Sequence, residues 1–337
     1  MSIQATLIAA ARGDAVDIPS GVDWPALLKA AEDEGMTALL ARAARGSAEE
    51  LRPLRVRAGM VAARASQMLE ELARIQQAFD AAGVRMLPYK GPLLSQQLYG
   101  RHDLRAFSDL DLIVAPADAA RGERILRTLG YHEPERLERW THRRFNSETV
   151  LVHDELQIAV DFHWRFGNVQ FPVPLTFDDA WSRRGSVLGL PTLGDDDLAL
   201  VVTTHAAKHL WHKLEFLAQL AALVRRGERG VPAVHRLLVR DFLGTDIGDV
   251  PMPEKYSAIH AIVSGNLFNG ATRKTDASGR DLFLLFDSRA AVLRALAVSV
   301  FVPTHADWAG SKAPTMLHWL LRPLRLVRKY LKMHTRR

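Results

Sequence analysis

Apolar residues recur at three- and four-residue steps over the first eighty residues, which is the spacing of amphipathic helices. Asp23-Trp24-Pro25 places proline just inside a helix start, where its missing N–H costs nothing. Ser47 and Glu50 have the spacing of a capping box, and a long periodic stretch follows from about residue 54 to residue 82. The pattern predicts an N-terminal helical segment over residues 1–82 that ends in one long helix.

The pattern becomes strand-like after residue 83. Residues 107–114 alternate at period two, with aspartates on one face and leucine and valine on the other. The predicted order of elements is a strand at 84–89, a helix at 90–99, a strand at 107–114, a helix at 116–129 and a hairpin at 144–164 that turns at Asp154-Glu155. This order predicts a small mixed sheet with helices on one face, over residues 83–166.

Residues 167–337 are mainly helical in pattern. A proline-rich, irregular stretch up to Pro191 is followed by an amphipathic run over 195–225 and by helices over 281–302 and 315–332. We therefore expect an α+β fold, in which the small mixed sheet lies between an N-terminal helical segment and a C-terminal helical region with a basic last helix.

The composition fits a globular chain and excludes several classes of function. The 337 residues are 48% hydrophobic and 24% charged, and the lack of cysteine excludes disulfide scaffolds, thiolate metal sites and cysteine nucleophiles. Walker A, Gly-x-Ser-x-Gly and Gly-x-Gly-x-x-Gly motifs are absent, so P-loop, serine hydrolase and dinucleotide chemistry are unsupported. Without a signal-peptide pattern or an apolar stretch long enough to cross a bilayer, we expect a soluble, cytoplasmic protein.

The net charge of +6 comes from the end of the chain. No acid follows Asp307, and the last 30 residues carry eight Lys and Arg, which leaves residues 1–307 with a net charge of −2. Apolar residues at helical spacing between residues 317 and 331 make this a basic amphipathic helix. Two interpretations stay open. We favour a helix docked on the core with its charges in water, and the alternative is contact with an anionic surface, either membrane or RNA.

Asp109 and Asp111 lie two residues apart in an apolar strand, so both carboxylates point the same way. Repulsion disfavours such a pair unless a cation lies between them, and Mg²⁺ takes carboxylate and phosphate oxygens. A third acid, Asp161, lies in a second apolar strand with His163 on its face. An isolated Asp-x-Asp is more often a solvated strand edge, but the apolar flanks and the third acid favour a metal site.

Lys90-Gly91-Pro92 joins a predicted strand to a predicted helix. A helix start offers free backbone N–H groups and the positive end of the helix dipole, both of which suit phosphate. Glycine permits close backbone approach, and Lys90 adds a positive charge. The junction is therefore a candidate phosphate site.

Three histidines, His205, His209 and His212, fall at i, i+4 and i+7 of a predicted helix. His-x-x-x-His is a zinc spacing, but Ala206 stands where a zinc protease has its glutamate. Packed, hydrogen-bonded histidines are the favoured interpretation.

Taken in order, these motifs resemble the uncharacterised nucleotidyltransferase family of the DNA polymerase β-like superfamily. The residues that carry the resemblance are Lys90-Gly91, Leu94, Tyr99, Arg105, Ser108-Asp109-Leu110-Asp111-Leu112 and Val160-Asp161-Phe162-His163-Trp164, then Leu200, His205-Ala206-Ala207-Lys208-His209 and Trp211-His212-Lys213-Leu214. The resemblance covers about residues 20–225, and it implies a nucleotidyltransferase core over 83–166 between the helical segments 1–82 and 167–337.

The resemblance implies an enzyme that uses Mg²⁺ or Mn²⁺ to transfer a nucleoside monophosphate from a nucleoside triphosphate to a hydroxyl-bearing acceptor. Asp109, Asp111 and Asp161 would hold the two metal ions and act in catalysis. The residues implied to line the nucleotide site are Lys90, Gly91, Arg105, Ser108, His163, His205, Lys208 and His209. The acceptor stays open, with a small molecule, a sugar or a protein favoured over nucleic acid.

Pro92 departs from the superfamily pattern, which has serine or glycine at this position. Proline supplies no hydroxyl and removes one backbone donor from the helix start. This departure motivates an alternative function, a non-catalytic nucleotide-binding or adaptor protein.

Overall fold

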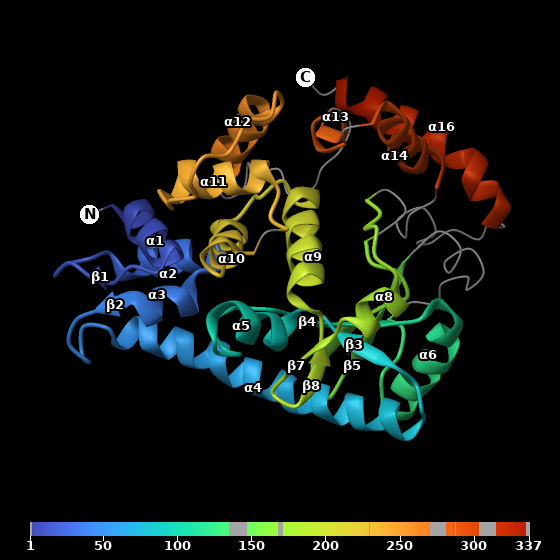
Figure 1. Ribbon diagram of the computed structural model, residues 1–337, viewed down its shortest axis with the longest axis horizontal. Coiled ribbons are helices and arrows are strands. Elements are labelled where there is room, and N and C mark those ends of the chain that lie inside the picture. The colour runs from blue at the N-terminus through green and yellow to red at the C-terminus, as the bar shows by residue number, and fades with distance from the viewer. Residues whose placement is uncertain are drawn as a thin grey trace.

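The structure is a computed structural model, and it describes residues 2–134, 147–167, 171–228, 230–269, 281–286, 288–302 and 315–334. It is a mixed α+β fold, as the sequence predicts: helices surround a small four-stranded sheet. In Figure 1 the long helix α4 (Arg52–Ala81) runs along one edge of the molecule, beneath the sheet. The N-terminal helices lie at one end, and the last helices lie above the sheet on the other side (Figure 1).

The N-terminal segment folds into the predicted helices. They are α1 (Ile3–Arg12), α2 (Trp24–Asp33), α3 (Thr37–Ala43) and α4. Asp23 caps α2 by accepting a hydrogen bond from the Ala26 amide at 3.0 Å, ahead of a proline in its first turn. Ser47 and Glu50 exchange the two bonds of a capping box, at 2.9 and 3.2 Å, in the turn before α4. The short parallel pair β1 (Val16–Asp17) and β2 (Ala44–Arg45) was not predicted.

The central sheet has the strand order β3-β4-β6-β5. Its strands are β3 (Met86–Pro88), β4 (Asp109–Val114), β5 (Glu148–His153) and β6 (Ile158–His163). The β4–β6 pair is parallel and the other two pairs are antiparallel, so the predicted mixed sheet is confirmed. The intervening helices are α5 (Gly91–Tyr99), the 3-10 turn η1 (Pro116–Asp118) and α6 (Ala119–Thr128).

One face of the sheet is apolar and is covered by α4 and α6. Leu112 of β4 and Phe162 of β6 belong to one buried cluster with Phe79 of α4, whose ring centroid lies 6.3 Å from that of Phe162. Helix α6 approaches so closely that a Cβ on Gly122 would lie 2.4 Å from the Phe162 ring. Because side chains alternate along a strand, the intervening residues of β4 and β6 point to the opposite face.

The chain beyond the sheet differs from the prediction in three places. Its elements are α8 (Phe177–Ser182), β7 (Gly185–Val187), β8 (Leu190–Thr192), α9 (Asp195–Lys208), α10 (Leu214–Arg225), α11 (Ala233–Leu243), α12 (Tyr256–Asn266), α13 (Asp281–Leu285), α14 (Arg289–Phe301) and α16 (Thr315–His334). The stretch expected to be irregular contains α8 and a hairpin, and the helix expected over 281–302 is two helices.

The third difference lies in the run over 195–225, which is two helices instead of one. Leu210 and Trp211 between them have left-handed φ values of 51° and 45°, and both side chains are buried. The apolar pattern runs straight through the break because the core holds these two residues as well as the flanking helices. His212 therefore lies outside the helix that carries His205, and the expected three-histidine helix is wrong at that position.

A buried carboxylate joins the N-terminal helices to the helical region that follows the sheet. Glu34, which follows α2, is 1% exposed. Its Oε2 accepts from the Leu214 amide at 2.8 Å, and its Oε1 accepts from the Phe268 amide at 3.1 Å. Helices α1 to α3 share one apolar core with α9 to α12, while α4 reaches from that core to the sheet, about 45 Å along its 30 residues. The division at residues 82 and 166 stays a prediction.

Candidate functional site

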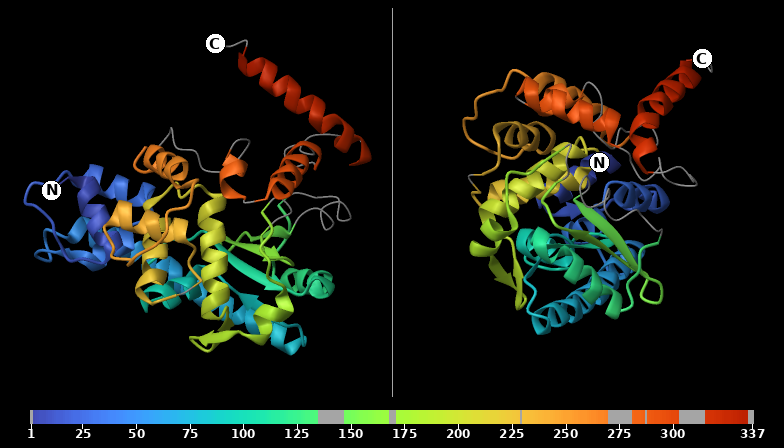
Figure 2. Two further views of the ribbon diagram at one scale, coloured as in Figure 1. Left: turned by 45° about the horizontal axis from the view of Figure 1, so that its top comes forward. Right: turned by 90° about the vertical axis from the view of Figure 1, so that its right-hand side faces the viewer.

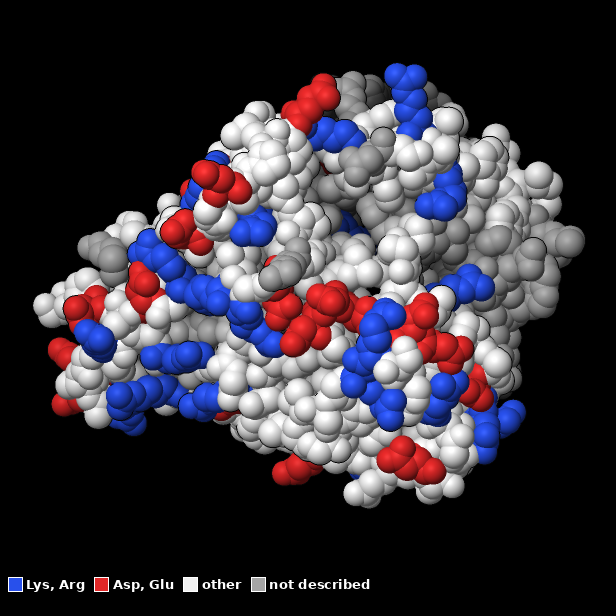
Figure 3. Space-filling view, viewed as in Figure 1, with Lys and Arg blue, Asp and Glu red and all other residues white. Residues whose placement is uncertain are grey.

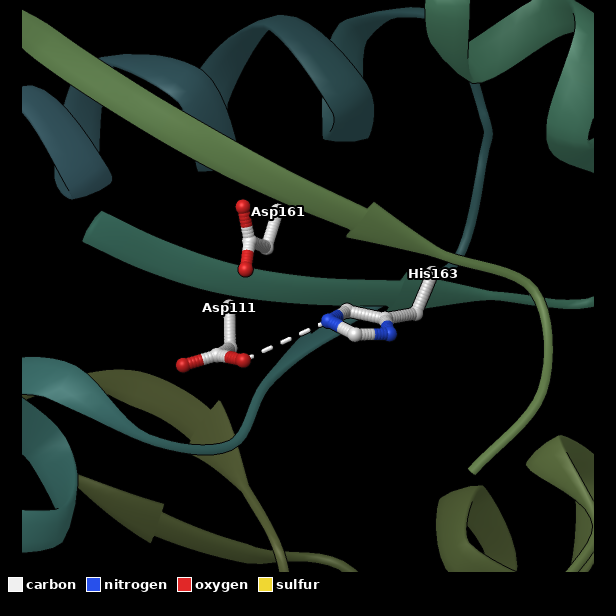
Figure 4. A group of neighbouring side chains, drawn as sticks. All are labelled: Asp111, Asp161 and His163. Atoms are coloured by element: carbon white, nitrogen blue, oxygen red, sulfur yellow. Dashed lines mark hydrogen bonds and ion pairs between the residues drawn. The ribbon is translucent and has the colours of Figure 1, made fainter. Parts of the chain in front are cut away.

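The polar face of the sheet brings together residues from two parallel strands. Asp111 of β4 lies directly opposite Asp161 of β6, and Ile113 lies opposite His163. Figure 4 shows the two carboxylates side by side, with the His163 ring turned toward Asp111. Asp109 is two residues before Asp111, on the same face. The sequence predicted this cluster by alternation within each strand, and the strand pairing supplies the alignment.

Asp111 is a buried carboxylate held by two cations. The Lys90 ammonium donates to its Oδ1 at 2.8 Å, and the His163 Nε2 lies 3.3 Å from the same oxygen. Burial alone would raise the pKa of Asp111, but Lys90 and then His163 overcome that effect and hold it well below its usual range. Asp111 is therefore ionised at neutral pH.

His163 bridges two carboxylates. Its Nδ1 lies 3.0 Å from the Oε2 of Glu148, the first residue of β5. Burial would lower the pKa of His163, but the two carboxylates raise it to about 9. For Glu148, burial would raise the pKa, and His163 lowers it to about 2. At neutral pH the ring is thus an imidazolium, which donates to Asp111 from Nε2 and pairs by charge with Glu148 through Nδ1.

Glu148 was missed by the sequence analysis. Its register partner in the hairpin is His163, which places it on the polar face of the sheet. The available signal was the alternation of side chains along the strand, which we call parity: Thr149 and Leu151 are buried, so Glu148 points to the opposite face. That parity shows which residues share a face, but it does not show that Glu148 contacts the histidine.

Asp161 is destabilised as a carboxylate. Burial raises its pKa, repulsion from Asp111, Asp109 and Glu148 adds to the effect, and the result is about 7. Burial and the charge of Asp111 also raise the pKa of Asp109. Among the described residues, the ion pairs of this face go to Asp111 and Glu148. The face therefore carries more negative charge than its own cations neutralise.

These residues fit a divalent cation. Asp111, Asp161 and His163 each offer a ligand atom, and these atoms lie within 4.8 Å of one another. Carboxylate oxygens are the ligands that Mg²⁺ and Mn²⁺ prefer. His163 is protonated on both nitrogens in this arrangement, so the two aspartates are the better ligands. Asp109 lies outside that group, and its Oδ2 accepts from the Ser108 hydroxyl at 3.5 Å.

The predicted phosphate junction forms at the start of α5. Gly91 has a φ of +59°, in the left-handed region that favours glycine, and a Cβ there would lie 3.6 Å from the Asp109 carbonyl oxygen. The start of α5 therefore lies directly beside the acidic strand. Pro92 removes one donor from this start, as the sequence implied.

The acidic face opens into a cleft of about 630 Å³. Of the residues implied to form the site, all but Gly91 line it: Lys90, Arg105, Ser108, Asp109, Asp111, Asp161, His163, His205, Lys208 and His209. The end of α9 contributes His205, Lys208 and His209. Three acids that the sequence did not single out also line the cleft, Glu32, Glu148 and Glu215, together with Lys213, which carries part of the resemblance but was given no role.

Two features of the cleft bear on what it binds. The buried Nε of Arg105 has no hydrogen-bond partner among the described residues, so this guanidinium has a donor to offer a ligand. His205 is buried, which lowers its pKa well below the usual value, and the Lys90 charge lowers it further. His205 and His209 pack around Phe216, with the His209 ring stacked on it at 6.0 Å. These ring contacts support the interpretation of His205 and His209 as packed histidines.

The comparisons with known proteins identify a family. A family model described as uncharacterised nucleotidyltransferase matches residues 20–238. The chain belongs to this family. No curated protein and no solved structure matches the chain. No described helix is both long and apolar enough to cross a membrane.

Proposed function

From this family membership and the geometry of the cleft, we propose that the protein transfers a nucleoside monophosphate from a nucleoside triphosphate to a hydroxyl-bearing acceptor, with Mg²⁺ or Mn²⁺ as cofactor. The observation that carries the proposal is the register of β4 and β6, which aligns Asp111 with Asp161 on the face that opens into the cleft. Three aspartates on one face that opens into one cleft provide carboxylate oxygens for divalent cations, which can bind phosphate oxygens at the same time.

In this proposal Asp109, Asp111 and Asp161 hold the metal. Bound there, a divalent cation supplies charge neutralisation on the phosphates and acidifies the attacking hydroxyl. Six carboxylates line the cleft against four Lys and Arg, and the acids are Glu32, Asp109, Asp111, Glu148, Asp161 and Glu215. A nucleoside triphosphate adds more negative charge, so added cations are needed for the cleft to bind it.

The chain's own cations and donors bind the triphosphate. Arg105 has a buried donor free for a phosphate oxygen, and its planar fork suits that group. Lys208 lies across the cleft at the end of α9, and the start of α5 offers backbone N–H groups. Lys90 and His163 both bind the Oδ1 of Asp111 in the ligand-free protein, so a divalent cation that binds Asp111 through Oδ2 meets repulsion from these two charges.

The acceptor lies outside what the residues specify. Residues 1–307 carry a net charge of −2, which disfavours a nucleic-acid acceptor and favours a small molecule, a sugar or a protein. Figure 3 agrees with this balance, because acidic and basic side chains are interleaved over the face in view.

A second candidate function is nucleotide binding without catalysis. Two observations favour it: Pro92 removes a donor from the phosphate junction, and the 2.8 Å ion pair of Lys90 with Asp111 places a positive charge beside the proposed metal ligands. Such a protein would bind a metal–nucleotide complex and release no pyrophosphate.

The test measures binding and transfer separately. Calorimetry with Mg²⁺ and a non-hydrolysable nucleoside triphosphate should show binding by the wild type and by Asp17→Asn, whose carboxylate is exposed on β1. Binding should be lost in Asp109→Asn and in Asp111→Asn. With α-labelled nucleotides and a panel of hydroxyl acceptors, label should reach an acceptor only with wild type and Asp17→Asn. Equal labelling by both cleft variants would refute the proposal, and binding with no pyrophosphate release would favour the second candidate.

A further inference from the structure

The last helix turns its apolar side outward. Leu317, Leu320, Leu324 and Val327 follow one another at three- and four-residue steps, so they share one face of α16. Their exposed fractions are 43%, 71%, 58% and 57%. A helix that buries its apolar stripe on its own core would show the reverse, so no described part of the chain covers this face.

The polar side of α16 is the side that contacts the protein. His318 is 1% exposed, and the Arg322 guanidinium donates to the Ser299 carbonyl near the end of α14, at 3.1 and 2.8 Å. The favoured expectation of a docked helix with its charges in water is therefore wrong for the described part of α16. Figure 2 shows α16 at the rim of the molecule, extending away from the rest of the fold in both views.

The charge of the segment limits what can cover this face. Residues 308–337 contain eight Lys and Arg and no acid, and in the sequence Arg325, Arg328 and Lys332 recur at three- and four-residue steps, as the apolar row does. A second copy of the helix would set cation against cation. RNA would meet the cations but would leave the four apolar side chains in water. An anionic lipid surface offers acyl chains to the apolar side chains and phosphate headgroups to the cations.

We propose that α16 is an interfacial helix that binds the surface of an anionic lipid bilayer, with Leu317, Leu320, Leu324 and Val327 in the acyl boundary and the neighbouring cations at the headgroups. The helix lies in the plane of the interface and does not span the bilayer. Membrane binding would bring the cleft of the sheet to the surface without using any residue of the cleft.

The test is flotation of the full-length protein with vesicles of phosphatidylcholine alone and with phosphatidylglycerol added. The wild type should float with the anionic vesicles and not with the neutral ones, and high salt should release it. Leu320→Gln with Leu324→Gln should reduce binding about a hundredfold, because two exposed leucines lose their place in the acyl boundary. Arg328→Gln with Lys332→Gln should reduce it about 25-fold at low salt, about fivefold for each cation.

The matched control is Val56→Gln with Met60→Gln on α4. These residues are 57% and 62% exposed, and they undergo the same apolar-to-amide change outside α16. Binding like that of the wild type is expected. The proposal is overturned by failure to bind anionic vesicles, by equal binding to neutral ones, or by an equal loss in the control. It is also overturned if Leu320→Gln with Leu324→Gln abolishes a dimer seen by light scattering, or if a polyribonucleotide binds as tightly as the vesicles and independently of the leucines.

Discussion

Replacing Asp161 with asparagine should stabilise the metal-free protein and abolish its activity. The folded state holds this carboxyl beside Asp111, Asp109 and Glu148, and burial with their repulsion raises its pKa to about 7, against 3.8 in a free side chain. Asparagine keeps the shape and removes the charge. The variant thus relieves repulsion that the fold tolerates at its candidate site.

The magnitude follows from the two pKa values. The unfolded carboxyl releases its proton near pH 4 and the folded one near pH 7, so the unfolding free energy of the wild type falls as pH rises between them. Three units correspond to about 4 kcal/mol, and partial contact of the side chain with water reduces this to about 2–4 kcal/mol at pH 8. Asp161→Asn does not lose unfolding free energy in this way, so it should exceed the wild type in unfolding free energy by more at pH 8 than at pH 5.

Urea denaturation in the presence of EDTA measures the effect at both pH values. Asp17→Asn removes the same charge from an exposed position and should change the unfolding free energy little. Added Mg²⁺ should narrow the gap between wild type and Asp161→Asn, because the cation binds the folded wild type more tightly. If Asp161→Asn is no more stable than the wild type at pH 8, or if its advantage is the same at pH 5, the electrostatic account of the site is refuted.

Two further predictions concern buried groups away from the cleft. Glu34→Ala leaves the amides of Leu214 and Phe268 without their carboxylate acceptor and should lower the unfolding free energy by about 2–4 kcal/mol in urea titrations. An unchanged unfolding free energy would show that Glu34 does not join the N-terminal helices to the helical region that follows the sheet. Burial lowers the pKa of His235 to about 4, below 6.5 in the unfolded chain, so this histidine takes up its proton on unfolding and stability falls as pH drops from 6.5 to 4. Between pH 6.5 and pH 4, the unfolding free energy of His235→Leu should fall by about 2–3 kcal/mol less than that of the wild type. An equal fall in both proteins would contradict the lowered pKa of His235.

The sequence predicts the central sheet well because the signals there are local. Alternation in β4 separates Asp109 and Asp111 from the core, and Gly91 marks the start of α5. The alignment of Asp111 with Asp161 is different in kind, since 50 residues separate them and only parallel pairing of β4 with β6 sets it. The resemblance to a family assigned Asp161 to the same metal site as Asp111, but neither that resemblance nor the periodicity within one strand gave the pairing.

Contacts between distant segments account for what the sequence did not reveal. Glu34 is one acid among several at the end of α2, and its role depends on two amides more than 150 residues away. The break at Leu210 and Trp211 was hidden because both residues are apolar and buried, so the pattern continued through a turn with left-handed backbone. Amphipathic pattern predicts that α16 has two faces, but it does not predict which face contacts the protein.

The three aspartates of the site differ in whether a positive side chain already contacts them, and this difference affects how a metal cation binds. Asp111 has both available cations, Lys90 and His163, while Asp161 and Asp109 have raised pKa values because nothing of opposite charge is set against them as closely. An incoming divalent ion therefore gains most from Asp161 and Asp109, where it relieves repulsion without displacing a partner. A cation bound to the Oδ2 of Asp111 instead repels the Lys90 ammonium on Oδ1 and weakens that ion pair, which makes the ammonium available beside the start of α5, where a phosphate would lie. In this arrangement metal binding and triphosphate binding support each other through Lys90.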